Sequence, residues 1–388
     1  MYFYMIITFA STMPAMAMRW LHIESDPVFE AIVFGIGIFG AAFLLSWAAE
    51  VAQMDISRGL ALAILALIAI LPEYAVDLYF AWVAAYEPAY SAYATANMTG
   101  ANRLLVGGGW PLVVLLFCLK FRKSHIQLEG SNRTEVSYLL IATLYAFTIP
   151  VKGSLNIVDF VILASIFACY AWRTAVMEVE EPHLVGPARL IATLPQGSRR
   201  TITVSLFVFA AFAIFSCAEP FAEALIASGK VLGIDEYFLV QWLAPLASEA
   251  PEFIIAALWS LRGQAPAAIG ALISSTVNQW TLLIGTIPVV YSISSGHVRE
   301  MVLDTRQQHE IFLTASQSVL AVMILMNLKM NLWESAALFF LFASQLVFPD
   351  IRVEVGVLFL ILATILIFKR AKYIGPLLKE GLFIPKDK

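Results

Sequence analysis

The sequence predicts an all-α integral membrane protein of about twelve transmembrane helices, with a core of two inverted five-helix repeats and one extra helix at each end. Three observations predict this fold class: an apolar composition, a series of apolar runs of spanning length, and a proline-glutamate step that occurs once in each half of the chain. Together they indicate a polytopic protein whose functional residues lie inside the bilayer.

The composition excludes an ordinary soluble protein. Hydrophobic residues make up 60% of the 388 residues, charged residues make up 13%, and the mean hydropathy is +0.81. In a soluble domain the charged fraction is about a quarter. The net charge of -4 says little, because in a membrane protein the placement of charge carries the information.

Apolar runs long enough to cross a bilayer recur along the whole chain. A spanning helix needs about 20 mainly apolar residues. Such runs lie at roughly 3–20, 28–52, 57–83, 91–119, 135–152, 155–175, 201–228, 235–260, 265–293, 310–328, 332–348 and 353–370. We interpret each run as one transmembrane helix.

The basic residues predict the orientation of these helices. If the N-terminus is cytoplasmic, most lysines and arginines fall in inner loops and in the C-terminal tail, among them Lys120, Lys123, Arg199 and Lys369. Positive charge accumulates on the cytoplasmic side of membrane proteins. We therefore expect both termini to be cytoplasmic, in the plasma (inner) membrane of a prokaryote.

The chain contains an internal repeat. Residues 28–175 and 201–348 each hold five predicted spans of matching character, and an odd number makes the second unit enter from the opposite face. Inverted repeats of this kind place a site near the membrane midplane. The predicted division is an extra N-terminal helix at 1–27, the first repeat at 28–175, a cytoplasmic linker at 176–200, the second repeat at 201–348, and an extra C-terminal helix with a basic tail at 349–388.

A proline followed by a glutamate lies in the middle of one span in each repeat, at Pro72-Glu73 and at Pro251-Glu252. An ionisable side chain at that depth costs a few kcal/mol and usually faces a cavity, a partner or an ion path. Each proline also frees the carbonyl four residues back, which is Ile68 or Ala247. A carboxylate beside free carbonyl oxygens suits a dehydrated hard cation.

Each glutamate has a second acid on the same helical face. Asp77 follows Glu73 by one helical turn, and Glu249 precedes Glu252 by one turn. Four acids near the midplane repel one another unless cations or protons balance them. For any single acid, a satisfied hydrogen bond inside the membrane is the alternative interpretation.

The next predicted helix in each repeat carries a polar cluster. The clusters consist of Asn97, Thr99, Gly100, Asn102 and Arg103 in the first repeat, and of Ser274, Ser275, Thr276, Asn278 and Gln279 in the second. Amide and hydroxyl oxygens can bind a cation without adding charge. We expect Asn102, Ser275 and Gln279 to do so, although hydrogen bonding between close-packed helices explains these residues equally well.

These motifs resemble the two alpha repeats of the calcium/cation antiporter superfamily, the membrane region of sodium/calcium exchangers. The family pattern is roughly G-T-S-L-P-E-L, followed in the next helix by G-N-x-x-G-S-N-x-x-N/D. Here the copies read Ala69-Ile70-Leu71-Pro72-Glu73-Tyr74 with Asn97-Met98-Thr99-Gly100-Ala101-Asn102, and Ser248-Glu249-Ala250-Pro251-Glu252-Phe253 with Gly270-Ala271-Leu272-Ile273-Ser274-Ser275-Thr276. The resemblance implies a cation antiporter that works by alternating access, with Glu73 and Glu252 as central ligands.

Two positions before the glutamates depart from the family pattern. The second copy keeps one of the two family hydroxyls as Ser248, and Glu249 replaces the other. The first copy has lost both, because Ala69 and Ile70 are apolar. Side-chain ligands are therefore missing from one half, which leaves the selectivity for calcium and the stoichiometry open.

Arg103 is a further departure. It follows Asn102 directly and places a fixed positive charge beside the predicted site, where it would compete with a transported cation. We expect Arg103 to balance charge by pairing with Glu249, Asp77 or Glu252.

We therefore predict a secondary active cation antiporter of the sodium/calcium exchanger type, which moves Ca²⁺ or Na⁺ against Na⁺ or H⁺. The predicted site consists of Glu73, Glu252, Asp77, Glu249, Ser248, Asn102, Ser275 and Gln279, with Arg103 balancing charge. Its partners would be small cations and the lipid bilayer, with no cofactor and no nucleic acid. We expect no enzymatic activity, because no nucleotide-binding loop or nucleophile-and-base arrangement stands out.

Two alternatives remain open. The first is a monovalent Na⁺/H⁺ exchanger, because the reduced oxygen set suits sodium or protons about as well as calcium. The second is a non-transporting scaffold in which Arg103 is an internal counterion for the acids.

Overall fold

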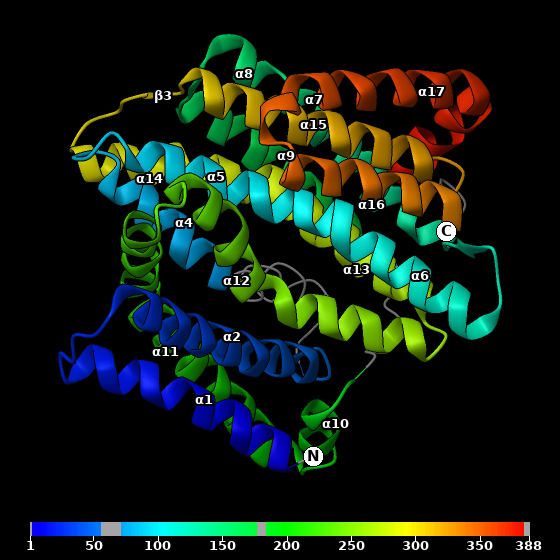
Figure 1. The fold of residues 1–388 in the computed structure, drawn as a ribbon. Coiled ribbons are helices and arrows are strands. Elements are labelled where there is room, and N and C mark those ends of the chain that lie inside the picture. Colours follow the sequence, from blue (N-terminus) through cyan, green and yellow to red (C-terminus); the bar gives the residue numbers. More distant parts are fainter. Residues whose placement is uncertain (1, 56–70, 177–183, 384–388) are drawn as a thin grey trace. The chain divides into compact units, whose positions relative to one another are not determined.

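The computed structural model describes residues 2–55, 71–176 and 184–383. These residues are mainly helical and belong to two compact units. Unit 1 comprises Met1–Phe80 and Ala175–Glu252, and unit 2 comprises Ala81–Thr174 and Phe253–Lys388. Each unit therefore combines segments from both halves of the sequence, as the colours of Figure 1 show.

Six helices contribute to unit 1. They are α1 (Tyr2–Trp20), α2 (Pro27–Ala52), α10 (Pro187–Ala192), α11 (Gln196–Leu232), and the greater parts of α4 (Leu71–Val83) and α12 (Glu236–Leu261), as far as the described residues extend. The last two helices continue past the unit boundary without a break.

Unit 2 contains the remaining described elements. Its helices are α5 (Tyr90–Leu104), η1 (Leu105–Gly109), α6 (Trp110–Phe121), η2 (Gly130–Asn132), α7 (Arg133–Ala146), α8 (Thr148–Lys152), α9 (Ile157–Ala175), α13 (Ala265–Asn278), η3 (Gln279–Leu283), α14 (Ile284–Ser295), α15 (Thr305–Leu325), α16 (Leu332–Val347), η4 (Pro349–Ile351) and α17 (Arg352–Leu382). Its strands are β1 (His125–Gln127), β2 (Ser154–Leu155), β3 (Met301–Val302) and β4 (Lys329–Asn331).

Small side chains let the helices of unit 1 approach closely. α2 packs against α1 and α11 (Figure 1). Gly37 of α2 faces Ala15 of α1 and Cys217 of α11, and a Cβ at this position would lie 2.6 Å from the Ala15 Cβ. Close contacts through small residues are typical of helices packed inside membranes.

The two acids that end the first predicted span of each repeat are both held within unit 1. Glu50 of α2 accepts the backbone N–H of Val185 at 2.8 Å. Glu223 of α11 accepts the hydroxyl of Tyr79 in α4 at 2.5 Å. Both carboxylates therefore connect different elements of the unit.

Two long helical runs of unit 2 share one local distortion. η1 joins α5 to α6 and η3 joins α13 to α14, and both joining segments are single π-helical turns. A π-helical turn contains one more residue per hydrogen-bonded ring than an α-helical turn and occurs frequently at functional sites. Each one lies at the end of a predicted polar cluster.

Short antiparallel strand pairs connect loops of unit 2. β1 pairs with β4, where Ile126 lies opposite Met330, and β2 pairs with β3, where Leu155 lies opposite Met301. In both pairs one strand comes from the first predicted repeat and the other from the second.

α15 is held firmly at both ends. Asp304 accepts the backbone N–H of Gln307 at 2.8 Å, and the Gln307 side chain accepts the N–H of Asp304 at 2.6 Å, which is a capping box. The Gln307 amide also donates to the hydroxyl of Thr95 in α5 at 3.0 Å. At the other end Arg370 of α17 donates to the carbonyl of Met323 at 3.1 Å, so the last turn of α15 has a cationic partner.

The predicted helical membrane class is confirmed in its coarse form, because the described helices fall on the predicted apolar runs. Six helical segments of the described chain are long and apolar enough to span a membrane: Pro27–Ala52, Tyr90–Phe121, Gly130–Lys152, Ile157–Ala175, Gln196–Leu232 and Ala265–Ser295. The number of about twelve spans and the inverted layout stay predictions.

The structure revises the helix start after the predicted linker. α10 and the first turn of α11 lie within 176–200, so that the first helix of the second predicted repeat begins at Gln196. The first part of the predicted span 57–83, with Ile68, Ala69 and Ile70, lies outside the described residues.

We expect Gly107→Ala to destabilise the protein and Gly108→Ala to leave it unchanged. A Cβ at Gly107 would lie 2.4 Å from the Cβ of Phe342 and 2.8 Å from Nε2 of Gln317, whereas a Cβ at Gly108 would meet Leu104 at an ordinary 3.6 Å. Overpacking of this kind costs about 1–3 kcal/mol. Thermal unfolding in detergent measures the difference, and equal melting temperatures would contradict the packing at Gly107.

A second prediction concerns an ion pair outside the apolar spans. Arg199 Nε donates to Oδ2 of Asp55 at 2.6 Å, and this hydrogen bond holds the pKa of Asp55 at about 2. Because the folded pKa is lowered, the stabilisation is fully present above about pH 4 and is lost as the pH falls towards 2. Asp55→Asn should therefore lower the melting temperature equally at every pH between about 5 and 8. If the difference in melting temperature between the wild type and Asp55→Asn changed across that range, the result would contradict the lowered pKa of Asp55.

Candidate functional site

The four predicted acids all lie in unit 1. Glu73 and Asp77 share one face of α4, and Glu249 and Glu252 share one face of α12. Glu73, Asp77 and Glu249 are buried, and Glu252 is half-buried. Buried carboxyl groups in an apolar segment need cations or protons to balance their charge.

α12 supplies oxygens beside its acids. Pro251 lies inside the helix and has no N–H, so the carbonyl of Ala247 lacks its helical donor. Ser248 donates its proton to the carbonyls of Ala244 and Pro245 at 3.3 and 3.2 Å. The Ser248 oxygen keeps its two lone pairs, which can bind a cation.

The polar clusters lie in unit 2, and their predicted ligands Asn102, Ser275 and Gln279 are all buried. Within the described part of the chain, Oγ of Ser275, Oδ1 of Asn278 and Nδ2 of Asn102 have no hydrogen-bond partner. Burying a polar atom without a partner is costly, and each such atom needs an explanation. Ser275 and Asn278 therefore offer oxygens that suit a cation, and the sequence had favoured Gln279 over Asn278.

Other members of the polar clusters form hydrogen bonds within their own helix or to a neighbouring helix. Thr99 donates to the carbonyl of Thr95 at 2.7 Å, and Thr276 donates to the carbonyl of Leu272 at 2.8 Å. The Ser274 hydroxyl lies 2.7 Å from the hydroxyl of Tyr170 on α9. For these three hydroxyls, hydrogen bonding within and between helices explains the burial.

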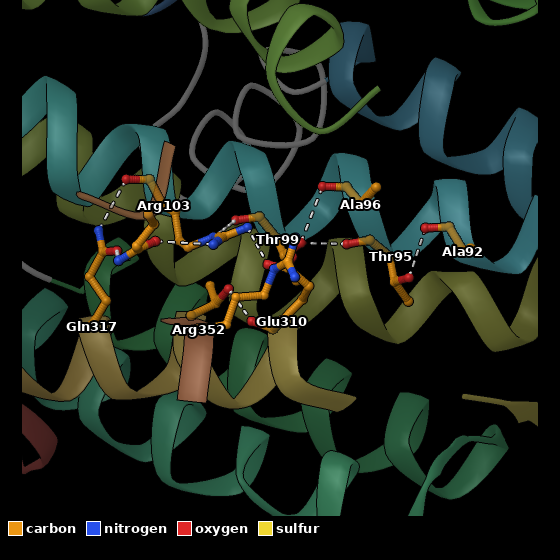
Figure 2. A network of polar contacts seen from close by, with 10 residues as sticks. Ala92, Thr95, Ala96, Thr99, Arg103, Glu310, Gln317 and Arg352 are labelled. Atoms are coloured by element: carbon orange, nitrogen blue, oxygen red, sulfur yellow. Dashed lines mark hydrogen bonds and ion pairs between the residues drawn. The ribbon is translucent and has the colours of Figure 1, made fainter. Parts of the chain in front are cut away.

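Arg103 takes part in a buried charge network (Figure 2). Its Nη2 lies 2.5 Å from Oε2 of Glu310, and its Nη1 donates to Oε1 of Gln345 at 3.0 Å. Oε1 of Glu310 lies 2.5 Å from Nε of Arg352. The side chains of Arg103 and Glu310 are 2% and 0% exposed, whereas that of Arg352 is 20% exposed. One fully buried carboxylate thus lies between two guanidinium groups.

The sequence analysis missed Glu310 as a partner of Arg103. The expected partners were Glu249, Asp77 or Glu252, and that pairing stays a prediction, whereas the structure describes an ion pair between Arg103 and Glu310. Glu310 lies at the edge of a predicted span, where an acid is usually interpreted as facing headgroup water. The available signal was Arg103 itself, because a buried arginine requires a carboxylate from some other helix.

A model of the family described as sodium/calcium exchanger protein matches residues 28–176 and 202–349 of the chain. The two matched segments cover well over half of the sequence. The comparison with curated proteins gives no match.

Among solved structures, the crystal structure of the H⁺/Ca²⁺ exchanger CAX is 42% identical in sequence, with a TM-score of 0.94 over 98% of this chain and 97% of that chain. The structure of native YfkE is 16% identical, with a TM-score of 0.64 over 89% and 98%. A structure of the sodium-calcium exchanger NCX_Mj is 14% identical, with a TM-score of 0.55 over 83% and 99%. The last two share only the fold with this chain.

We expect Glu310→Gln to be strongly destabilising. The change leaves the guanidinium of Arg103 buried without its carboxylate, and breaking a buried pair in this way costs about 3–5 kcal/mol. Arg352→Gln should cost less, because the side chain of Arg352 is partly exposed. Melting temperatures in detergent test the order, with Glu300→Gln in an exposed loop as the matched control. If Glu310→Gln and Glu300→Gln had the same melting temperature, the charge network would not stabilise the fold.

Proposed function

This chain belongs to the sodium/calcium exchanger protein family, and from that premise we propose that it is a secondary antiporter that moves Ca²⁺ across a membrane in exchange for H⁺. The resemblance inferred from the two proline-glutamate motifs is confirmed by the family match. The observation that carries the choice of ions is the 42% identity, over 98% of the chain, to a structure titled as an H⁺/Ca²⁺ exchanger.

The acids of the chain supply the charge balance that this exchange requires. Carboxylates at Glu73 and Glu252 match the charge of one Ca²⁺. When the ion leaves, the same groups take up protons, because they cannot remain empty and ionised in apolar surroundings. Calcium and protons then exclude each other from the site, and this competition couples their movements and prevents a leak.

Neutral oxygens complete the proposed site. Calcium takes about six to eight oxygen ligands, of which carboxylates supply only a part. We assign the Ser248 and Ser275 hydroxyls and the side-chain amides of Asn102, Asn278 and Gln279 to this set. Among the described residues, the Ser275 and Asn278 oxygens have no hydrogen-bond partner, and this supports their assignment. Asp77 and Glu249 complete or neutralise the site.

The charge network favours transport over the scaffold alternative. That alternative needs Arg103 as the counterion of the predicted acids. Glu310 and Gln345 already bind the guanidinium of Arg103 in unit 2. Its positive charge is therefore paired with an acid outside the predicted site.

The proposal also includes the membrane in which the protein lies and the side on which its termini lie. The protein is an integral membrane protein, as its apolar helices and its family indicate. We place both termini in the cytoplasm because of the distribution of lysine and arginine, and we keep the expectation that the membrane is the plasma membrane of a prokaryote.

The test is Ca²⁺ uptake into liposomes that contain the purified protein, driven either by a pH gradient or by a Na⁺ gradient. We expect uptake with the pH gradient alone, accompanied by proton movement in the opposite direction. Uptake with the Na⁺ gradient alone would replace H⁺ by Na⁺ in the proposal. Proton release on addition of Na⁺ without any Ca²⁺ flux would favour the monovalent exchanger.

Substitutions in the same liposomes test the residues. Glu73→Gln and Glu252→Gln each remove one ionisable carboxyl group with little change of shape, and both should reduce Ca²⁺ uptake to that of protein-free liposomes. Glu87→Gln, in an exposed turn after α4, is the matched control and should transport normally. Equal background flux in wild type, Glu73→Gln and Glu252→Gln for every cation tried would leave the scaffold as the better explanation.

A further inference from the structure

A single serine of α15 bridges the two helical runs that carry the polar clusters. The Ser318 hydroxyl lies 3.1 Å from Oδ1 of Asn102, at the end of α5, and 2.9 Å from Nε1 of Trp280 in η3. All three side chains are buried, with exposed fractions of 0%, 3% and 1%. None of the predicted ligands lies on α15 itself.

The chemistry of the three groups fixes the direction of both hydrogen bonds. An indole N–H can only donate, so the Ser318 oxygen accepts from Trp280. The serine has one proton, and the nearby amide oxygen of Asn102 accepts it. The bridge therefore runs from Trp280 through Ser318 to Asn102.

This direction determines what Asn102 presents to its surroundings. Its amide oxygen is turned towards α15, while its Nδ2 has no partner among the described residues. The sequence analysis expected the Asn102 oxygen to bind a cation. In the structure this oxygen accepts the hydrogen bond from Ser318 and keeps its second lone pair for a cation.

Further contacts hold α15 against α5 and so fix the position of the helix that carries Ser318. Gln307 donates to the hydroxyl of Thr95, Gln317 donates to the carbonyl of Arg103 at 3.1 Å, and Glu310 pairs with the Arg103 guanidinium. These contacts lie along the same side of α5, and several of them are visible in Figure 2. Ser318 is thus positioned by a helix that cannot easily turn relative to α5.

We propose that Ser318 is a positioning residue for the cation site, which holds the Asn102 amide in one orientation and fixes α5 relative to η3 by accepting the indole N–H of Trp280. The inference rests on the proposed function, because Asn102 and Gln279, the neighbour of Trp280, are assigned to the site. Ser318 does not touch the ion. Its loss therefore changes how well the site is arranged for the ion and leaves the number of ligands unchanged.

The test compares Ser318→Ala with Ser316→Ala. Ser316 is an equally buried serine of α15, but its hydroxyl donates only to the carbonyl of Phe312 in its own helix, at 2.8 Å. We expect Ser318→Ala to raise the apparent KM for Ca²⁺ about three- to tenfold, as the loss of one or two buried hydrogen bonds implies. Ser316→Ala should keep the wild-type KM, and Ser318→Thr, which retains a hydroxyl, should restore most of it.

A second readout does not depend on transport. The indole N–H resonance of Trp280, assigned by its disappearance in Trp280→Phe, should shift in Ser318→Ala and stay in place in Ser316→Ala. An unshifted resonance would overturn the bridge. A shifted resonance with an unchanged KM would overturn the positioning role.

Failure of the proposed function gives a different result. If the wild-type protein moved no Ca²⁺ in the liposomes, the antiporter proposal would fail, and with it the role of Ser318, whatever the indole resonance showed. If Ser318→Ala does not fold, Ser318→Cys keeps the size with a weaker donor and should raise the KM in the same direction. An unchanged KM in that variant would count against the proposal.

Discussion

The need to balance every charge in an apolar interior is the constraint on which the rest of unit 2 depends. Arg103 has almost no contact with solvent, and it retains its charge under all ordinary conditions. Glu310 meets that need and is shared with Arg352, so that one carboxylate joins α5, α15 and the first residue of α17. Since neither α5 nor α15 can move away without exposing an unpaired charge, the ion pair also fixes the segment that leads into η1.

Buried neutral polar groups also need partners, and they fall into two classes: those that have a hydrogen-bond partner and those that lack one. A buried hydroxyl that donates back to its own helix, as in Thr99 and Thr276, has satisfied its proton and serves local structure. The oxygens of Ser275 and Asn278 lack such partners within the described chain. A protein that buries unsatisfied oxygens gives up stability unless a ligand compensates for it. This difference separates residues that support their own helices from residues that we assign to the ion site, and the sequence alone does not show it.

The sequence predicted the helices well and their partnerships poorly, for one physical reason. Spanning length, proline position and the depth of Glu73 and Glu252 are local properties, so they can be read from short stretches. The pairing of Arg103 with Glu310 and the bridge from Trp280 to Asn102 join segments that are distant in the chain and meet only in the folded protein. No spacing rule predicts such meetings. A buried arginine shows that an acid is needed, but it does not show which helix supplies the acid.

The contacts of unit 2 also join segments of the two predicted repeats. Arg103 lies in the first repeat and its partner Glu310 lies in the second, and both strand pairs join one repeat to the other. An arginine in one repeat without an acid in the other would be an isolated buried charge, at a cost of several kcal/mol. The two residues therefore depend on each other. The asymmetry of the proposed site, in which one repeat lacks hydroxyls before its glutamate and carries an arginine, is compatible with a stable fold because the other repeat supplies the opposite charge.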